Sequence, residues 1–181
     1  MPVDTRLTYD DFCLLPEDGK RREIIEGDLF VTPSPVTPHQ RTVIRLSSHL
    51  WYFVDSHKLG EVFSAPFDVV FSEFDVVEPD ILYISNARAG ILTHRNVQGA
   101  PDLVVEVLSE GTEKRDRTIK LELYGKFGVD EYWTVDPNGP SADIYRRGEK
   151  GLTLVATLSA EDALTSPMFP GFRLPLRELV D

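Results

Sequence analysis

The feature that most constrains the fold is a carboxylate inside an apolar run. Glu106 lies in the segment 101–108, where five of the eight residues are Leu or Val. Such a run is typical of a strand covered on both faces of a sheet. Because an isolated buried carboxylate costs several kcal/mol or becomes neutral, we expect a cation, a metal ion or a hydrogen-bond cluster beside it. Asp80 lies in a second apolar run, 76–84, so the sequence predicts two carboxylates carried by strands.

The hydrophobic pattern gives an order of elements for the whole chain. The predicted elements are a short helix from Thr8, a hairpin over 22–32, a helix over 37–57, strands in 61–71, 76–84 and 102–108, a helix over 114–127, a strand over 131–136 and a hairpin over 142–158. A polar loop is expected over 86–100. This order favours a mixed central sheet flanked by helices, of the α/β or α+β class with extra hairpins toward both ends, over a purely parallel wound sheet.

Two of the predicted helices have well-defined boundaries and stripes. Thr37 is placed as the N-terminal cap of the first, with Pro38 at the first helical position. Its apolar stripe consists of Val43, Leu46, Leu50, Phe53 and Val54. Gly128 is placed as the C-terminal cap of the helix over 114–127. The buried stripe predicted for that helix consists of Ile119, Leu123 and Phe127.

Size and composition are those of an ordinary globular chain. The 181 residues are enough for one domain with a full core, which we expect to span 1–181. The single cysteine, Cys13, excludes an internal disulfide and a cysteine-rich zinc site. No apolar stretch approaches the roughly 20 residues of a membrane span. The first residues lack the apolar core of a signal peptide, so a cytoplasmic location and no membrane partner are expected.

The net charge of −11 narrows the range of partners. It counts against a nonspecific nucleic-acid binder, whose affinity usually comes from Lys and Arg that neutralise phosphates. It is compatible with a metal-dependent nuclease, because the ion supplies positive charge where carboxylates cluster. Basic residues gather at 20–22, 114–117 and 146–147. Each group is expected to be a solvated surface patch, and the middle one flanks the suspected site.

The two strand-borne acids suggest a divalent-metal site suited to phosphodiester chemistry. If their strands pair, Asp80 and Glu106 come close enough to bind one ion. Mg²⁺ prefers oxygen ligands and keeps several waters, so two carboxylates and the backbone carbonyl of Val107 would suffice. Lys120 is the lysine best placed to position a nucleophile or neutralise the transition state. Its spacing from Asp116 is also explained by an ordinary ion pair on the helix surface.

Several motifs resemble the Uma-type restriction endonuclease family, a bacterial family of the PD-(D/E)XK nuclease superfamily. The resemblance rests on VEPDI (77–81), PDLVVEVLS (101–109), the segment from Asp116 through Lys120 to Tyr124, and GVDEYWTVDP (128–137). Further similarity lies in PEDGK (16–20), EIIEGD (23–28), PSP (33–35) with His39, and TSPMFPGF (165–172). The resemblance therefore spans nearly the whole chain.

The resemblance implies a restriction endonuclease-like core of a helix, three strands, a second helix and a fourth strand. It implies that Asp80, Glu106 and Lys120 are catalytic, and that Asp80, Glu106 and Val107 bind Mg²⁺ or Mn²⁺. The superfamily signature has a lysine two residues after the second acid, where this chain has Leu108. In the Uma-type pattern the lysine lies on the following helix, which Lys120 matches.

Other polar positions are candidates with less specific signals. Glu23 and His39 resemble further polar positions of the family and are candidate substrate-binding residues, although His39 is equally explained as a surface or capping residue. Asp68 and Asp102 are weaker candidates, because each can simply satisfy local backbone. Lys114 is the next candidate for the catalytic lysine.

Three functions remain compatible with the sequence. The first is a Mg²⁺-dependent DNA endonuclease that acts as a homodimer, so that two sites address two strands. The second is a metal-dependent phosphodiesterase that acts on another nucleic acid or on a nucleotide. The third is a nuclease-like binding or interaction module without turnover, which the acidic surface and Leu108 favour. A cluster that keeps its buried acids counts against this third function.

Overall fold

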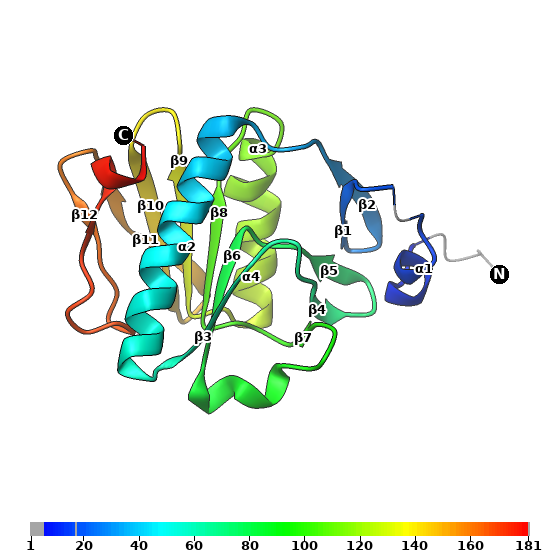
Figure 1. The fold of residues 1–181 in the computed structure, drawn as a ribbon. Helices are drawn as coiled ribbons and strands as arrows, with labels where there is room; N and C mark the ends of the chain where they lie inside the picture. The colour runs from blue at the N-terminus through cyan, green and yellow to red at the C-terminus, as the bar shows by residue number, and fades with distance from the viewer. Residues whose placement is uncertain (1–5, 17, 181) are drawn as a thin grey trace.

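A six-stranded mixed sheet forms the centre of the fold. The computed structural model describes residues 6–16 and 18–180. The strands of this sheet, in spatial order, are β3 (Gly60–Ser64), β6 (Ile81–Ser85), β8 (Leu103–Val107), β9 (Glu131–Asp136), β10 (Ser141–Gly148) and β11 (Gly151–Leu158). The pair β8 and β9 is parallel and the other neighbours are antiparallel. The expected mixed α/β class and the order of the restriction endonuclease-like core are therefore confirmed (Figure 1).

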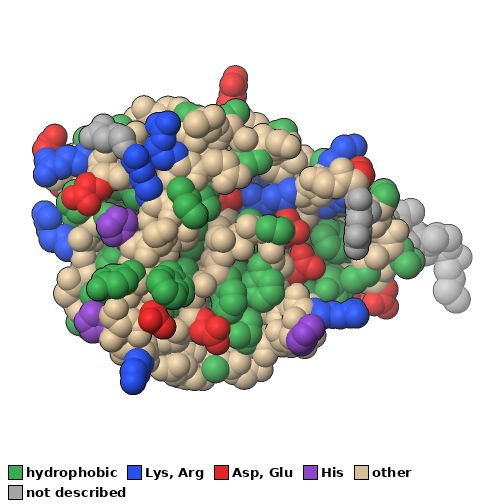
Figure 2. All heavy atoms as spheres, in the orientation of Figure 1, with side chains coloured by type: hydrophobic (Ala, Val, Ile, Leu, Met, Phe, Trp, Pro, Cys, Tyr) green, Lys and Arg blue, Asp and Glu red, His purple; other side chains and the backbone are tan. Residues whose placement is uncertain are grey.

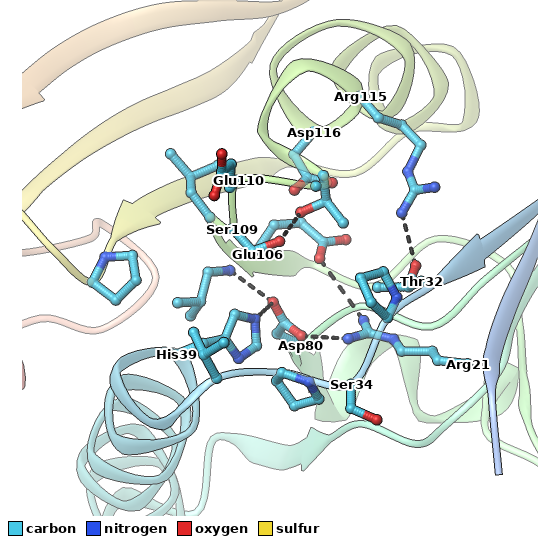
Figure 3. A pocket seen from close by; sticks show the side chains of 18 of the residues that line it. Arg21, Thr32, Ser34, His39, Asp80, Glu106, Ser109, Glu110, Arg115 and Asp116 are labelled. Atoms are coloured by element: carbon cyan, nitrogen blue, oxygen red, sulfur yellow. Dashed lines mark hydrogen bonds and ion pairs between the residues drawn. The ribbon is translucent and has the colours of Figure 1, made fainter.

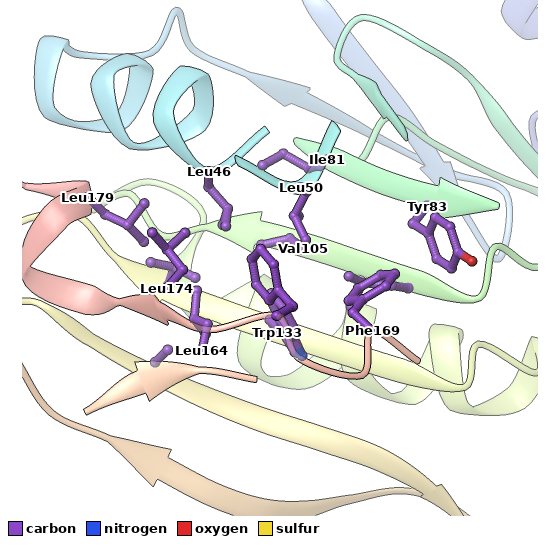
Figure 4. Close-up of a cluster of buried hydrophobic side chains, with 14 of the residues drawn as sticks. Leu46, Leu50, Ile81, Tyr83, Val105, Trp133, Leu164, Phe169, Leu174 and Leu179 are labelled. Carbon is purple, nitrogen blue, oxygen red and sulfur yellow. The ribbon is translucent and has the colours of Figure 1, made fainter. Parts of the chain in front are cut away.

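The hydrophobic core has two parts, one on each face of this sheet. On one face Leu46 and Leu50 of α2 (Thr37–His57) pack against Val105 (Figure 4). On the other face Tyr124 of α4 (Leu121–Phe127) belongs to the same cluster as Val104. Since successive side chains of a strand point to opposite faces, β8 is covered on both sides, as its apolar run predicts.

A smaller sheet carries the N-terminal hairpin. Its strands, in spatial order, are β2 (Asp28–Thr32), β1 (Arg21–Ile25), β5 (Asp75–Val77), β4 (Val69–Ser72) and β7 (Val97–Gln98). Figure 1 shows this sheet to the right of the central one, with the short helix α1 (Tyr9–Cys13) beyond it. The Thr8 cap and the hairpin are as predicted, and β1 pairs in addition with β5.

Two runs predicted as single strands are each divided in the structure. The run 61–71 becomes β3 and β4, and the run 76–84 becomes β5 and β6, so each run contributes to both sheets. A proline, Pro66 or Pro79, lies at each division. Proline has no backbone N–H to donate to a ladder, so a strand does not continue through it. The predicted loop 86–100 contains a 3-10 helix, η1 (Asn86–Ile91), and β7.

The helix α2 has the predicted length but a different start. Its N-cap residue is Val36, and Thr37 is already in the helix. Among the described residues no side chain caps this end, because the backbone of Val36 rather than that of Thr37 takes the extended cap conformation. Leu46, Leu50 and Val54 of the predicted stripe are fully buried.

The helix predicted over 114–127 is interrupted by a π-helix. Its parts are α3 (Glu113–Arg115), the π-helix η2 (Asp116–Lys120) and α4. Ile119 is 40% exposed, so the predicted stripe is wrong at this position, and Asp116 and Lys120 face inward instead. The wide turn changes which side chains meet the sheet, and π-turns often occur at functional sites. Gly128, at a φ of +97°, ends α4 as predicted.

The C-terminal segment completes the face that α2 covers. It contains β12 (Ala163–Leu164), β13 (Leu174–Pro175) and the 3-10 helix η3 (Leu176–Leu179). Leu174 and Leu179 join the cluster of α2 shown in Figure 4. None of the described helices is both long and apolar enough to cross a membrane. Glu17, within the PEDGK motif, lies outside the described residues.

Candidate active site

A cavity of about 320 Å³ lies where β8 ends, between the start of α2 and the π-helix. Figure 3 shows polar side chains from all of these elements pointing toward it. Asp80, Glu106 and Lys120 line this cavity, as do His39 and Val107. The structure therefore brings together four of the predicted site side chains. It also places Val107, whose backbone carbonyl is the predicted third ligand, at the same cavity.

Asp80 lies directly before β6 and is held by three donors. The backbone N–H of Val107 donates to Oδ2 at 2.8 Å, and Nε2 of His39 lies 3.2 Å from the same oxygen. Nη1 of Arg21 donates to Oδ1 at 2.7 Å. Burial alone would raise the pKa of Asp80, but the hydrogen bond to His39 and the charge of Arg21 outweigh it and bring the pKa to about 2.

Glu106 lies on the neighbouring strand and is almost fully buried. Its Oε1 accepts hydrogen bonds from Nζ of Lys120 at 2.8 Å and from the hydroxyl of Tyr124 at 2.7 Å. Burial raises its pKa to about 8, the charge of Lys120 opposes the shift, and Asp116 and Asp80 add to it. A second positive charge near Glu106 would therefore stabilise its ionised form.

Lys120 is buried among three carboxylates rather than exposed on the helix. Its Nζ lies 2.7 Å from Oε1 of Glu23, 2.8 Å from Oε1 of Glu106 and 3.7 Å from Oδ1 of Asp116. Burial lowers the pKa of Lys120, but Glu106 and Glu23 outweigh burial, so its pKa lies above its ordinary value and the ammonium stays charged. The interpretation of Asp116 and Lys120 as a surface ion pair is wrong, since both side chains are 2% exposed.

Arg21 is a site residue that the sequence analysis missed. It was assigned with 20–22 to a solvated patch, yet its side chain is only 20% exposed. Its Nη2 donates to the backbone carbonyl of Glu78 and lies 4.0 Å from Oε2 of Glu106. The alternation of β1 is the signal that could have found it, because Arg21 and the fully buried Glu23 share one face of that strand.

Glu23 lies behind the cavity rather than on its wall. Besides Lys120 it meets Arg115, whose Nη2 is 3.4 Å from Oε2 of Glu23. Its Oε1 also accepts a hydrogen bond from the backbone N–H of Glu78 at 3.1 Å. Arg115 was likewise assigned to a surface patch, but its side chain is 13% exposed and lines the cavity. Glu23 therefore pairs with Lys120 and Arg115, and these two cations line the cavity.

The remaining candidates lie away from this centre. Asp102 accepts hydrogen bonds from the backbone N–H and the hydroxyl of Ser85 at 2.7 and 2.9 Å. It therefore satisfies a backbone group, which is one of the roles predicted for it. Asp68 and Glu78 interact with each other, and burial raises the pKa of both carboxyls, that of Glu78 to about 7. Lys114 is exposed on α3 and is not part of the cavity lining.

The charges and donor atoms of the site fit a divalent ion. The three cations Arg21, Arg115 and Lys120 face more carboxyl groups than they can neutralise. These carboxyl groups are Glu23, Glu78, Asp80, Glu106 and Asp116. When all five are ionised, the excess of two negative charges equals the charge of one Mg²⁺ or Mn²⁺, and carboxylate oxygens are ligands that both prefer. Within residues 6–16 and 18–180 no three His, Cys, Asp or Glu side chains form a complete ligand set, so an ion here would keep waters.

Comparisons with known proteins identify the family of this chain. The sequence model of the Uma2 family, described as "Putative restriction endonuclease", matches residues 9–177. The chain therefore belongs to that family, which confirms the resemblance found in its motifs.

A solved structure supports the same fold. It is described as "a putative nuclease belonging to DUF820" from Anabaena variabilis ATCC 29413. It matches with a TM-score of 0.79 at 21% sequence identity, over 96% of this chain and 97% of that one. Among curated proteins none matches this sequence.

Proposed function

We propose that this protein is a divalent-metal-dependent endonuclease that hydrolyses phosphodiester bonds, with DNA as substrate and Mg²⁺ or Mn²⁺ as cofactor. The observation that carries the proposal is the meeting of Asp80, Glu106 and Lys120 at one cavity. Membership of a restriction endonuclease family supports it. We assign this activity to residues 1–181 as a single domain that acts in the cytoplasm.

Asp80 and Glu106 are the residues proposed to hold the ion, with the carbonyl of Val107 as a third protein ligand. The bound ion would supply Lewis acidity and a water that is easier to deprotonate. His39 and the N–H of Val107 fix the orientation of the Asp80 carboxylate through its Oδ2. Lys120 and Tyr124 do the same for Glu106 through its Oε1. Both acids are thus oriented before an ion arrives.

Lys120 is proposed to serve the transition state with its charge. Its ammonium borders the cavity and is held by Glu23 and Glu106, so its position is fixed before substrate binds. A fixed positive charge in a dry site stabilises the charge that develops on a phosphate more than a mobile one does. His39 is proposed to contact substrate from the cavity wall, and Glu23 to act on substrate through Lys120.

A homodimer is proposed as the working assembly. The strand β3 is an edge of the central sheet, and the neighbouring face of α2 exposes Ile44, Trp51 and Tyr52 by 63%, 55% and 70%. Figure 2 shows hydrophobic side chains gathered on the face that α2 forms. Exposed apolar patches and open strand edges are typical of interfaces. A second copy is the favoured occupant, because an antiparallel edge is complementary to itself about a two-fold axis.

A binding module without turnover is the second candidate, and Arg21 favours it. A guanidinium that contacts Asp80 and approaches Glu106 can replace a metal ion permanently. The protein would then keep the nuclease fold and the buried acids without hydrolysing a substrate.

Cleavage by matched variants tests the proposal. We expect wild-type protein, free of host nucleases and supplied with Mn²⁺ or Mg²⁺, to cut plasmid DNA at low salt. Low salt is needed because the net charge of −11 repels DNA. Asp80→Asn and Glu106→Gln should each lower the rate by ~100-fold or more. Glu149→Gln, in the exposed turn between β10 and β11, is the control that should cut as wild type does.

The substrate panel separates the candidates. Single- and double-stranded DNA and RNA of equal length are offered with each ion. Cleavage of RNA alone would favour the phosphodiesterase that acts on another nucleic acid. A folded wild-type protein that cuts nothing in the panel would favour the module.

A further inference from the structure

Arg21 meets the two acids through the oxygens that are left for an ion. Oδ2 of Asp80 is already occupied by the N–H of Val107 and by His39. Oε1 of Glu106 is occupied by Lys120 and Tyr124. The remaining oxygens, Oδ1 of Asp80 and Oε2 of Glu106, lie 2.7 and 4.0 Å from the Arg21 guanidinium. Figure 3 shows this guanidinium beside both carboxylates.

A divalent ion and this guanidinium would compete for the same two oxygens. An ion bound at ~2.1 Å from Oδ1 of Asp80 would lie where Arg21 now donates its hydrogen bond. The two cations would also repel each other at this short separation. Binding of an ion by Asp80 and Glu106 therefore requires Arg21 to move.

Arg21 has a second anchor that would remain after such a movement. Its Nη2 donates to the carbonyl of Glu78, and its Nε lies 3.5 Å from Oε2 of the same residue. The side chain is 20% exposed, so one side of it borders open space. Glu78 would thus hold the displaced guanidinium at the cavity wall.

We propose that Arg21 is a built-in cation that occupies the ion position in the metal-free protein and exchanges with the divalent ion. The proposal rests on the metal-dependent function proposed above. Arg21 pairs with Asp80 and lies near Glu106 when no ion is bound, and it lowers the apparent affinity for the ion by competing for the same oxygens. It is therefore the residue that sets the metal concentration at which the site fills.

Metal-binding calorimetry on variants of neighbouring arginines tests this exchange. Arg21→Gln should bind Mn²⁺ about 10-fold more tightly than wild type, because the competing cation is gone. Arg21→Lys should fall between them, since it keeps the charge without the planar fork. Arg22→Gln is the matched control and should bind as wild type does, because Arg22 pairs with Asp18 and the carbonyl of Pro16. Glu106→Gln should lose binding and thereby locate the ion.

The outcomes separate the exchange from the function on which it rests. Tighter binding by Arg21→Gln supports both. Equal or weaker binding by Arg21→Gln, with wild type still binding and cutting, overturns the exchange and leaves the metal-dependent nuclease intact. A wild-type protein and an Arg21→Gln variant that both fail to bind Mn²⁺ overturn the metal-dependent function and the exchange together.

A measurement on the wild type guards against variants that do not fold. In protein labelled with ¹⁵N-arginine, the Nε–Hε resonance of Arg21 is assigned by its loss in Arg21→Lys. Saturating Mg²⁺ should shift this resonance while the resonance of Arg22 stays in place. An Arg21 resonance that does not move at saturation contradicts the exchange.

Discussion

At the scale of single residues, the environments of two neighbouring acids push their pKa values apart. Asp80 has a pKa of about 2, because His39 and Arg21 outweigh its burial. Glu106 has a pKa of about 8, because burial and the negative charges of Asp116 and Asp80 outweigh Lys120. At neutral pH this pair of acids therefore has one permanent negative charge, on Asp80, and a second, on Glu106, that a proton or a cation neutralises.

The raised pKa of Glu106 predicts how stability depends on pH. The carboxyl binds its proton more tightly in the folded chain than in the unfolded one, whose pKa is 4.5. Its contribution to stability is therefore present below pH 4.5 and is lost as the pH rises toward 8. Without metal, the melting temperature should fall across this interval, and less so in Glu106→Gln. The rise in melting temperature caused by Mg²⁺ should grow over the same interval. Identical profiles for the two proteins in differential scanning fluorimetry would contradict this assignment.

Burial of Lys120 predicts a large loss of stability when it is removed. Lys120→Ala leaves Glu23, Glu106 and Asp116 without their shared cation, which should cost about 3–5 kcal/mol. Urea unfolding measures the loss. Lys114→Ala, on the exposed part of the same helical segment, should change stability by less than about 0.5 kcal/mol. Equal effects of the two substitutions would mean that Lys120 is not buried as described. Lys120 is therefore best tested for catalysis in Lys120→Met combined with Glu23→Gln, where a positive and a negative charge are removed together and the proposed ligand Glu106 is kept.

At the scale of elements, the hydrophobic pattern predicts the helices and strands that local sequence determines. It misses the features that depend on contacts with distant parts of the chain. The helix α2, the hairpin of β10 and β11 and the strand β8 follow from periodicity and turn residues. The inward face of the π-helix does not, because ion pairs of Lys120 with Glu23 and Glu106 decide it. Asp80 and Glu106 could be paired from strand alternation. Arg21 could not, since its place depends on how the smaller sheet docks.

The uncapped start of α2 predicts a stabilising substitution. Val36 occupies the N-cap with an extended backbone and a side chain that accepts no hydrogen bond. A serine there can accept one from a free backbone N–H of the first turn, so Val36→Ser should stabilise the protein by about 0.5–1 kcal/mol. Urea unfolding measures the gain. Val36→Ala is the control that removes the same apolar atoms without adding a cap, and a gain of equal size in both would exclude the capping explanation.

At the scale of the whole molecule, the site is assembled from two sheets. Glu106 lies on β8 of the central sheet, and Asp80 directly precedes β6 of the same sheet. Arg21 and Glu23 lie on β1 of the smaller sheet. The resemblance to a nuclease family identifies Asp80 and Glu106 from the sequence. The docking of the hairpin that carries Arg21 and Glu23 is visible only in the structure.

The exposed face of α2 predicts the oligomeric state. Wild-type protein should sediment as a dimer, and Trp51→Glu should sediment as a monomer, because a charge at this position of the apolar face opposes close contact. Analytical ultracentrifugation over a concentration series measures the shift. Leu154→Glu, at an exposed apolar position of β11, is the control and should not change the state. A wild-type monomer at all concentrations would exclude this interface.

The dependence of the site on β1 has a consequence for the order of folding. Arg21 and Asp80 are 59 residues apart in the chain, whereas Lys120 and Glu106 are separated by 14. Contacts that close long loops form late, and during synthesis the hairpin leaves the ribosome well before its partners in β8 and α4 exist. The pair of Lys120 and Glu106 can therefore form first, with the hairpin docking onto it last. A nascent chain lacks a complete set of charges at the cavity, so the proposed hydrolytic activity would arise only when folding is finished.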